Sequence, residues 1–160
     1  MRWSEFAAAC PEIAALAEER LRSDELVLVG TIREDGSPRI SPNEVDITAG
    51  ELFLGMMWQS RKARDLARDP RCVLHSVPSD RINPGGDVKL YGRAVEVRDP
   101  DLRRVYREAI KARIDWQPEE PNYHCFVLDV ERAAFVVFGE RREVLAWDRA
   151  RGLRHLPFPG

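Results

Sequence analysis

The stretch ELFLGMMWQSRKARDLARDPRCVLHS, residues 51–76, predicts three elements in direct succession. The apolar run LFLGMMW (52–58) is typical of a short strand. Ser60 is then a suitable N-cap for a helix that the Asp-Pro pair at 69–70 ends, and CVLHSV (72–77) is typical of a further strand. The stretch therefore predicts a sheet in which a short helix begins where one strand ends.

Short apolar runs bounded by turn residues continue on both sides of this stretch. An Asp-Gly pair within REDGSP lies between the runs at 25–32 and 39–48 and predicts an antiparallel hairpin, while Pro42 predicts a bulge or an edge in the second run. Further strands are expected at 88–97, 124–130, 133–139 and 143–147. Many antiparallel strands with few helices predict a mainly β chain forming a small barrel with flanking helices.

Helical periodicity occurs at the margins of these runs. Residues 4–22 predict an opening helix, capped by Ser4 and broken near Pro11, and residues 99–113 predict a second helix that begins at an Asp-Pro pair. A length of 160 residues with 44% apolar content is typical of one packed unit. We therefore expect a single domain over 1–160.

Composition excludes several classes of function. A formal net charge of −2 provides no general positive field for nucleic acid or an anionic membrane. Because there is no apolar run of about 20 residues and no secretory signal, a cytoplasmic location is expected. Three widely spaced cysteines predict reduced thiols instead of a disulfide framework or a zinc site, so no metal is expected.

Signatures of protein-borne catalysis are absent from the sequence. No GxSxG, HExxH or phosphate-binding glycine loop occurs, and the three histidines are isolated. No catalytic residue is predicted, which points to a bound cofactor that brings its own chemistry. Ser60, Arg61 and Lys62 stand at a helix start, where free amides and the helix dipole favour a phosphate.

A structural alternative exists for this basic stretch. Arg64, Asp65, Arg68 and Asp69 have the spacing of a solvated helix face, in which exposed ion pairs contribute little to stability. We interpret these four residues in that way and retain the three residues before them as a phosphate clamp. The preceding GMMW supplies apolar side chains that suit a flat ligand, although such residues also serve in cores.

Two segments, GTIREDGSPRISP (30–42) and residues 51–76, together with the order of elements, resemble the FMN-binding split-barrel proteins related to pyridoxamine 5′-phosphate oxidase. The SRKA helix start followed by DPR is the most specific part of this resemblance. It implies a six-stranded antiparallel split β-barrel that forms a homodimer with a flavin between the subunits.

The resemblance also implies roles for particular residues. The phosphate would lie at Ser60, Arg61 and Lys62, and the flavin ring would lie beside the backbone or side chains of 41–43. The implied cofactor-binding residues are Ser41, Pro42, Asn43, Met56, Met57, Ser60, Arg61, Lys62 and Trp147. Trp147 resembles a C-terminal residue that approaches the partner's cofactor, and packing on the barrel is its alternative.

One departure argues against pyridoxamine phosphate as substrate. Where the oxidase carries a basic residue on its second strand, this chain reads SPNEVD (41–46). The chain resembles instead a branch that uses FMN or the deazaflavin F420 to transfer hydride to small conjugated substrates. F420 is slightly favoured, because its acidic tail could meet a cluster formed by Arg141, Arg142, Arg149, Arg151 and Arg154, which could equally be solvated.

Two other classes of function remain alternatives. A non-catalytic split-barrel protein could store a flavin or bind heme, and His155 is the residue that a heme hypothesis would use. A nucleic-acid partner would use the basic helix, but neither net charge nor interleaved aromatics favour it.

Overall fold

The computed structural model describes residues 1–24, 26–78, 85–138 and 142–158. In this part of the chain the helices are α1 (Trp3–Ala9), α2 (Pro11–Ser23), α3 (Arg61–Arg68) and α4 (Pro100–Ile114). The strands are β1 (Leu26–Ile32), β2 (Pro38–Thr48), β3 (Glu51–Met57), β4 (Arg71–Ser76), β5 (Asp87–Glu96), β6 (Tyr123–Val137), β7 (Glu143–Asp148) and β8 (Gly152–Leu156).

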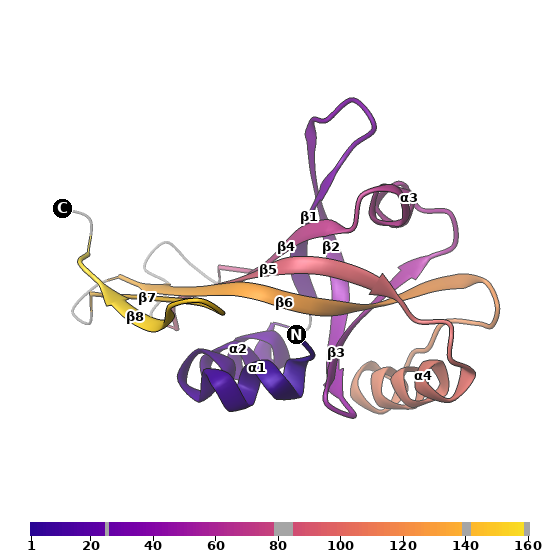
Figure 1. The fold of residues 1–160 in the computed structure, drawn as a ribbon. Coiled ribbons are helices and arrows are strands. Elements are labelled where there is room, and N and C mark those ends of the chain that lie inside the picture. Colours follow the sequence, from indigo (N-terminus) through magenta and orange to yellow (C-terminus); the bar gives the residue numbers. More distant parts are fainter. Residues whose placement is uncertain (25, 79–84, 139–141, 159–160) are drawn as a thin grey trace.

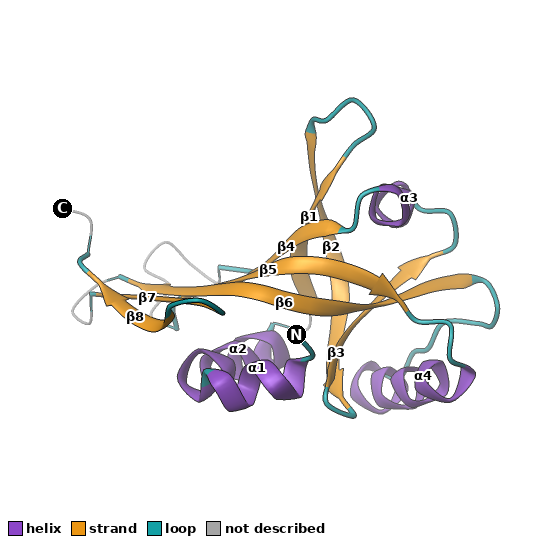
Figure 2. Cartoon of the chain, in the orientation of Figure 1, coloured by secondary structure: helices purple, strands orange, loops and turns teal. Residues whose placement is uncertain are grey.

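Six strands close into the predicted antiparallel barrel. The sheet order is β3-β2-β1-β4-β5-β6-β7-β8, and an additional pairing of β3 with β6 closes the first six strands on themselves. Strands β7 and β8 extend the sheet away from the barrel (Figure 2). Strand β8 was not predicted, because its five residues are at most half-buried and lack the apolar alternation of the other strands.

The helices lie at the margins of the barrel, as predicted. Cys10 separates α1 from α2, and Pro11 occupies the first turn of α2, where its missing N–H costs nothing. The first helix begins at Trp3 with Arg2 as its cap residue, so the assignment of Ser4 as the cap was wrong. None of the helices described here has the length and apolar character needed to cross a bilayer.

The Asp-Gly pair forms the expected hairpin between β1 and β2. Residues 26–32 pair with 38–44 in unbroken register, and within the described chain β2 pairs with β3 only from Val45 onward. Pro42 therefore lies opposite Leu28 on a segment whose other edge carries no described strand. A proline is tolerated there because no ladder partner requires its N–H, so the predicted edge is confirmed.

The strand expected at 124–130 and most of the strand expected at 133–139 form one strand, β6, which ends at Val137; residue 139 lies outside the described residues. Glu131 is an extra residue in β6, because Tyr91 pairs with Arg132 while Gly92 pairs with Val130. From Phe126 to the bulge the even-numbered positions are the buried ones, and after it the odd-numbered positions are, with Glu131 and Arg132 both exposed between them. Two separate strands were expected here, whereas a bulge allows the faces to exchange within one continuous strand.

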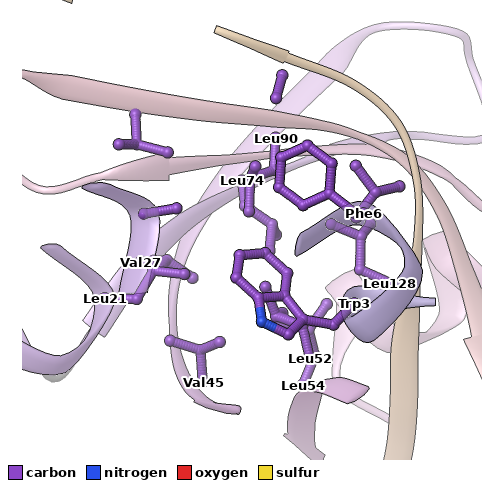
Figure 3. Packing of buried hydrophobic residues seen from close by; sticks show 14 of the residues in the cluster. Trp3, Phe6, Leu21, Val27, Val45, Leu52, Leu54, Leu74, Leu90 and Leu128 are labelled. Carbon is purple, nitrogen blue, oxygen red and sulfur yellow. The ribbon is translucent and has the colours of Figure 1, made fainter. Parts of the chain in front are cut away.

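A large apolar core lies between the barrel and the two N-terminal helices. Trp3 and Phe6 of α1 contact each other edge to face, and Figure 3 shows them pointing toward Leu52, Leu54 and Leu128. Each fully buried side chain of this size contributes about 1.5–3 kcal/mol. A second cluster lies under α4 around Phe53, Tyr106, Ile110 and Tyr123.

Candidate functional site

The turn between β3 and α3 fixes where the predicted phosphate clamp begins. Gln59 adopts a positive φ of 56°, and the Ser60 amide donates to the Met57 carbonyl at 3.0 Å. Ser60 occupies the N-cap position, but its hydroxyl forms no capping hydrogen bond. Its Oγ is buried and finds no partner among the described residues, so a polar group is left available at the helix start.

An apolar cavity of about 430 Å³ opens beside this turn. One part of its wall consists of Pro42 and Glu44 from β2, Gly55, Met56 and Met57 from β3, and Lys62 from α3. Met56 is buried, whereas the side chain of Met57 is 76% exposed at the rim. Four of the nine predicted cofactor-binding residues therefore meet at one cavity: Pro42, Met56, Met57 and Lys62.

Lys62 is the cationic group of the apolar cavity. Its Nζ donates to the Pro42 carbonyl oxygen at 2.6 Å, which ties α3 to β2. Burial lowers the pKa of Lys62, and the nearby Glu44 carboxylate partly opposes that change. A second anion here would further favour the charged amine, so the position suits a phosphate or carboxylate group.

The opposite wall of the apolar cavity was not predicted. It comes from α4 and the segment after it, and includes Tyr106, Trp116, Asn122 and Tyr123. Burial raises the pKa of Tyr106, so this phenol is neutral at physiological pH. The one available signal was an exposed tryptophan in the proline-rich run WQPEEPNY (116–123), but its proximity to β3 depends on long-range packing.

Arg61 lies on a different surface from Lys62. A hollow of about 670 Å³, which we call the arginine hollow, is lined by Arg33, Glu34, Asp35, Arg39, Arg61, Arg64, Asp65 and Arg68. Successive residues of a helix point about 100° apart, so neighbours in sequence can serve two surfaces. The structure thus divides the predicted clamp between two hollows.

Asp65 is not part of a solvated face, and its interpretation as such was wrong. The residue is only 5% exposed, and its Oδ2 accepts hydrogen bonds from Arg39 Nε at 2.6 Å and Thr31 Oγ1 at 2.9 Å. Burial alone would raise its pKa, but these hydrogen bonds and the charges of Arg39 and Arg68 lower the pKa overall. Asp65 is therefore an ionised anchor beneath the arginine hollow.

Three more of the predicted cofactor-binding residues do not line the apolar cavity: Ser41, Asn43 and Trp147. Ser41 and Asn43 alternate with Pro42 and Glu44 along β2, and neither lines the apolar cavity. Asn43 is buried, and its Oδ1 has no hydrogen-bond partner in the described chain. Trp147 is 3% exposed, and its ring packs edge to face on Phe6 with the ring centroids 5.0 Å apart. It therefore packs on the barrel, which was the alternative to a role at the cofactor.

Two of the five C-terminal arginines pair with carboxylates, and Arg142 is exposed. Arg149 pairs with Asp129 at 3.2 Å, and Arg154 pairs with Asp148 at 2.9 Å. Arg151 is exposed, and Arg141 lies outside the described residues. The two ion pairs agree with the alternative that these arginines belong to the protein surface and do not bind an acidic cofactor tail.

Comparisons with known proteins agree with the fold described above. The family model for pyridoxamine 5′-phosphate oxidase matches residues 13–137. No curated protein sequence matches the chain.

Solved structures share the architecture at low sequence identity. A heme binding protein from Mycobacterium smegmatis is 22% identical with a TM-score of 0.63; the match covers 82% of this chain and 57% of that one. ChuZ from Campylobacter jejuni is 13% identical with a TM-score of 0.73, covering 94% of this chain and 64% of that one.

PhzG from Burkholderia lata 383, solved in complex with tetrahydrophenazine-1-carboxylic acid, is 16% identical with a TM-score of 0.62 and is matched over 92% of this chain and 88% of its own. Such likenesses establish the shared fold alone. The family match, in contrast, spans all six barrel strands and the helix α3 that carries the SRKA start. This chain therefore belongs to the pyridoxamine 5′-phosphate oxidase family of split-barrel proteins.

Proposed function

We propose that this protein is an oxidoreductase that uses FMN or F420 to transfer hydride to or from a small conjugated substrate. The observation that carries this proposal is the position of Lys62, a partly desolvated amine at the rim of an apolar cavity lined by Met56 and Met57. A cofactor with a flat ring and a phosphate group needs an apolar cavity for the ring and a nearby cation for the phosphate.

The residues present fit such a cofactor. Lys62 and the buried, unpartnered Ser60 Oγ would hold the phosphate at the start of α3, where the helix dipole also favours an anion. Met56, Met57 and Pro42 would contact the ring and exclude water from it. The cofactor, when bound, supplies the hydride chemistry, so the protein needs no nucleophile of its own.

The choice between FMN and F420 is open to experiment. The pairing of Arg149 and Arg154 with carboxylates removes part of the argument that favoured F420. The run Ser41-Pro42-Asn43 contains no cationic side chain, and Arg39 of the same strand is bound to Asp65, which still argues against pyridoxamine phosphate as substrate.

A homodimer completes this proposal. Ile40, Met57 and Trp58 are large apolar side chains that are exposed on and beside the strands bearing the site. Exposed apolar groups of this kind are typical of surfaces that another chain covers. A second copy placed there would cover the open rim of the apolar cavity.

Titration of the purified protein with FMN and with F420, followed by fluorescence, tests the proposal. Loss of a charged hydrogen-bond donor costs about 1.5–3 kcal/mol, so Lys62→Ala should weaken binding by about 10- to 150-fold. Lys111→Ala, which removes an exposed lysine of α4, is the matched control and should bind like the wild type. Equal affinities for both variants would remove Lys62 from the site, and the absence of binding by either cofactor would overturn the proposed function.

A second candidate function is non-catalytic binding of heme. It is motivated by the heme binding protein among the similar structures and by His155, whose side chain is exposed on β8 near Glu143. A Soret band that appears on heme titration and disappears in His155→Ala would favour this function over the first.

A further inference from the structure

The arginine hollow concentrates positive charge on a protein that is negative as a whole. Its lining carries five guanidinium groups against three carboxylates, a net formal charge of +2, while the chain has a net charge of −2. Positive charge concentrated in one hollow of a negatively charged protein favours a site for a particular anionic ligand. It does not favour general binding of nucleic acid, which a positive charge over the whole protein would promote.

The floor of the hollow is already arranged around one carboxylate. Arg39 and Arg68 share Asp65, at 2.6 Å and 3.7 Å respectively, so that a single negative charge faces two guanidinium groups. Arg68 also donates to the Ile32 carbonyl oxygen, which ties α3 to the end of β1. These bonds hold both arginine side chains in place before any ligand arrives.

Three further arginines have no such partner. Among the described residues, no carboxylate lies within ion-pair distance of Arg33, Arg61 or Arg64. Asp35 accepts hydrogen bonds from the amide and hydroxyl of Ser37 at 2.9 and 2.6 Å, which lower the pKa of Asp35, and the charge of Arg33 helps to lower it without a direct ion pair between the two. Arg61 and Arg64 are therefore the arginines of the hollow that are most available to an external anion, while Arg33 is partly balanced by Asp35.

The hollow has two walls from separate elements. The hairpin of β1 and β2, which carries Arg33 and Arg39, projects beyond the barrel, and α3 lies beside it (Figure 1). Arg61, Arg64 and Arg68 follow one another at helical spacings of three and four residues along α3. At 1.5 Å per residue these steps are about 4.5 and 6 Å along the axis, which suits a ligand with successive anionic groups.

We propose that the arginine hollow is a binding site for a small molecule that carries two or more phosphate or carboxylate groups. Guanidinium groups bind both anions through paired hydrogen bonds, and a hollow of about 670 Å³ accommodates a molecule of ordinary ligand size. The site is distinct from the apolar cavity, because Arg61 lines the one and Lys62 the other. It does not require the proposed flavin chemistry.

Calorimetric titration of the full chain with tripolyphosphate and with tri-glutamate tests the proposal and separates the two anion chemistries. Inorganic phosphate and glutamate, at matched ionic strength, are the controls with fewer charges. We expect at least one oligoanion to bind with an affinity that falls as salt is raised, because screening weakens exposed charge pairs. If neither oligoanion binds at low salt, the proposal is overturned.

Charge-reversal variants locate the binding. Arg64→Glu replaces an exposed, unpaired arginine of the hollow and should weaken binding by about 3- to 10-fold. Arg151→Glu changes the charge equally at an exposed position between β7 and β8 and should leave affinity unchanged. An equal loss in both variants, or a loss in Arg151→Glu alone, would assign the anion to general charge or to the C-terminal arginines and refute the site. Flavin titration of Arg64→Glu separates this result from the proposed function, since that affinity should not change.

Discussion

Gly55→Ala is expected to destabilise the wall of the apolar cavity. Gly55 lies near the end of β3 opposite Cys125, and Tyr106 of α4 covers it. A methyl group built on Gly55 would be 2.1 Å from Tyr106 Oη and 2.8 Å from its Cζ, well inside contact distance. The tyrosine is 1% exposed and stacks on Phe53 at 5.4 Å, so the ring cannot move without disturbing the cluster under α4.

The size of this effect follows from overpacking in a closed site. Inserting one methyl group into a packed core costs about 1–3 kcal/mol when neighbours must shift. For a domain of this length the same loss lowers the melting temperature by about 3–9 °C. Urea unfolding should therefore show a lower midpoint, while the slope of the unfolding free energy against urea concentration stays unchanged. An unchanged slope indicates that stability has changed and the unfolded state has not.

A double mutant separates the contact with Tyr106 from a general cost of replacing glycine in a strand. Tyr106→Phe removes the nearest atom, the phenolic oxygen, and leaves the ring. We expect Gly55→Ala to cost less by at least about 0.5 kcal/mol in the Tyr106→Phe background than in the wild type. Strict additivity of the two substitutions would show that the close approach does not cause the loss, and would refute the reasoning.

Two further substitutions test the roles assigned to buried residues. Asp65→Asn should lower the free energy of unfolding by about 2 kcal/mol at pH 7, because Arg39 loses its charged partner in a partly buried site. The folded pKa of Asp65 is below its usual 3.8, so its contribution to the free energy of unfolding is present above pH 3.8 and is lost as the pH falls through the folded pKa. Urea unfolding at several pH values should therefore show the stabilities of wild type and variant converging in acid. Trp147→Phe should cost about 1–2 kcal/mol by loosening the contact with Phe6, measured by the same method, while leaving cofactor affinity unchanged in a fluorescence titration. A large loss of affinity without loss of stability would instead return Trp147 to the cofactor site.

Local patterns were sufficient to predict the barrel. Apolar runs of strand length, the Asp-Gly turn and the Asp-Pro helix boundaries depend on neighbouring residues, and the structure confirms the six barrel strands and the position of α3. The edge position of Pro42 was predictable for the same reason, because a missing N–H restricts where any proline can pair.

The site was only partly predictable because it depends on contacts between distant segments. The ion pair of Asp65 with Arg39 joins residues 26 positions apart, and periodicity along α3 alone made Asp65 part of a solvated face. Likewise, Trp116 and Tyr123 reach the apolar cavity only because β3 pairs with β6. The direction of each side chain at the start of α3, which separates Arg61 from Lys62, depends on how the helix packs on β1 and β3.

The bulge at Glu131 has a consequence for how this chain can change in length. Val130 on one side of it and Ala133 on the other are both buried only because the extra residue resets the alternation of faces. Deleting Glu131 alone would turn Ala133, Phe135 and Val137 toward solvent, since a strand exchanges its two faces with every single-residue shift. β6 therefore obeys a parity rule: insertions and deletions within this strand must come in pairs, or be compensated by a second bulge, if its segment beyond Glu131 is to keep its buried face.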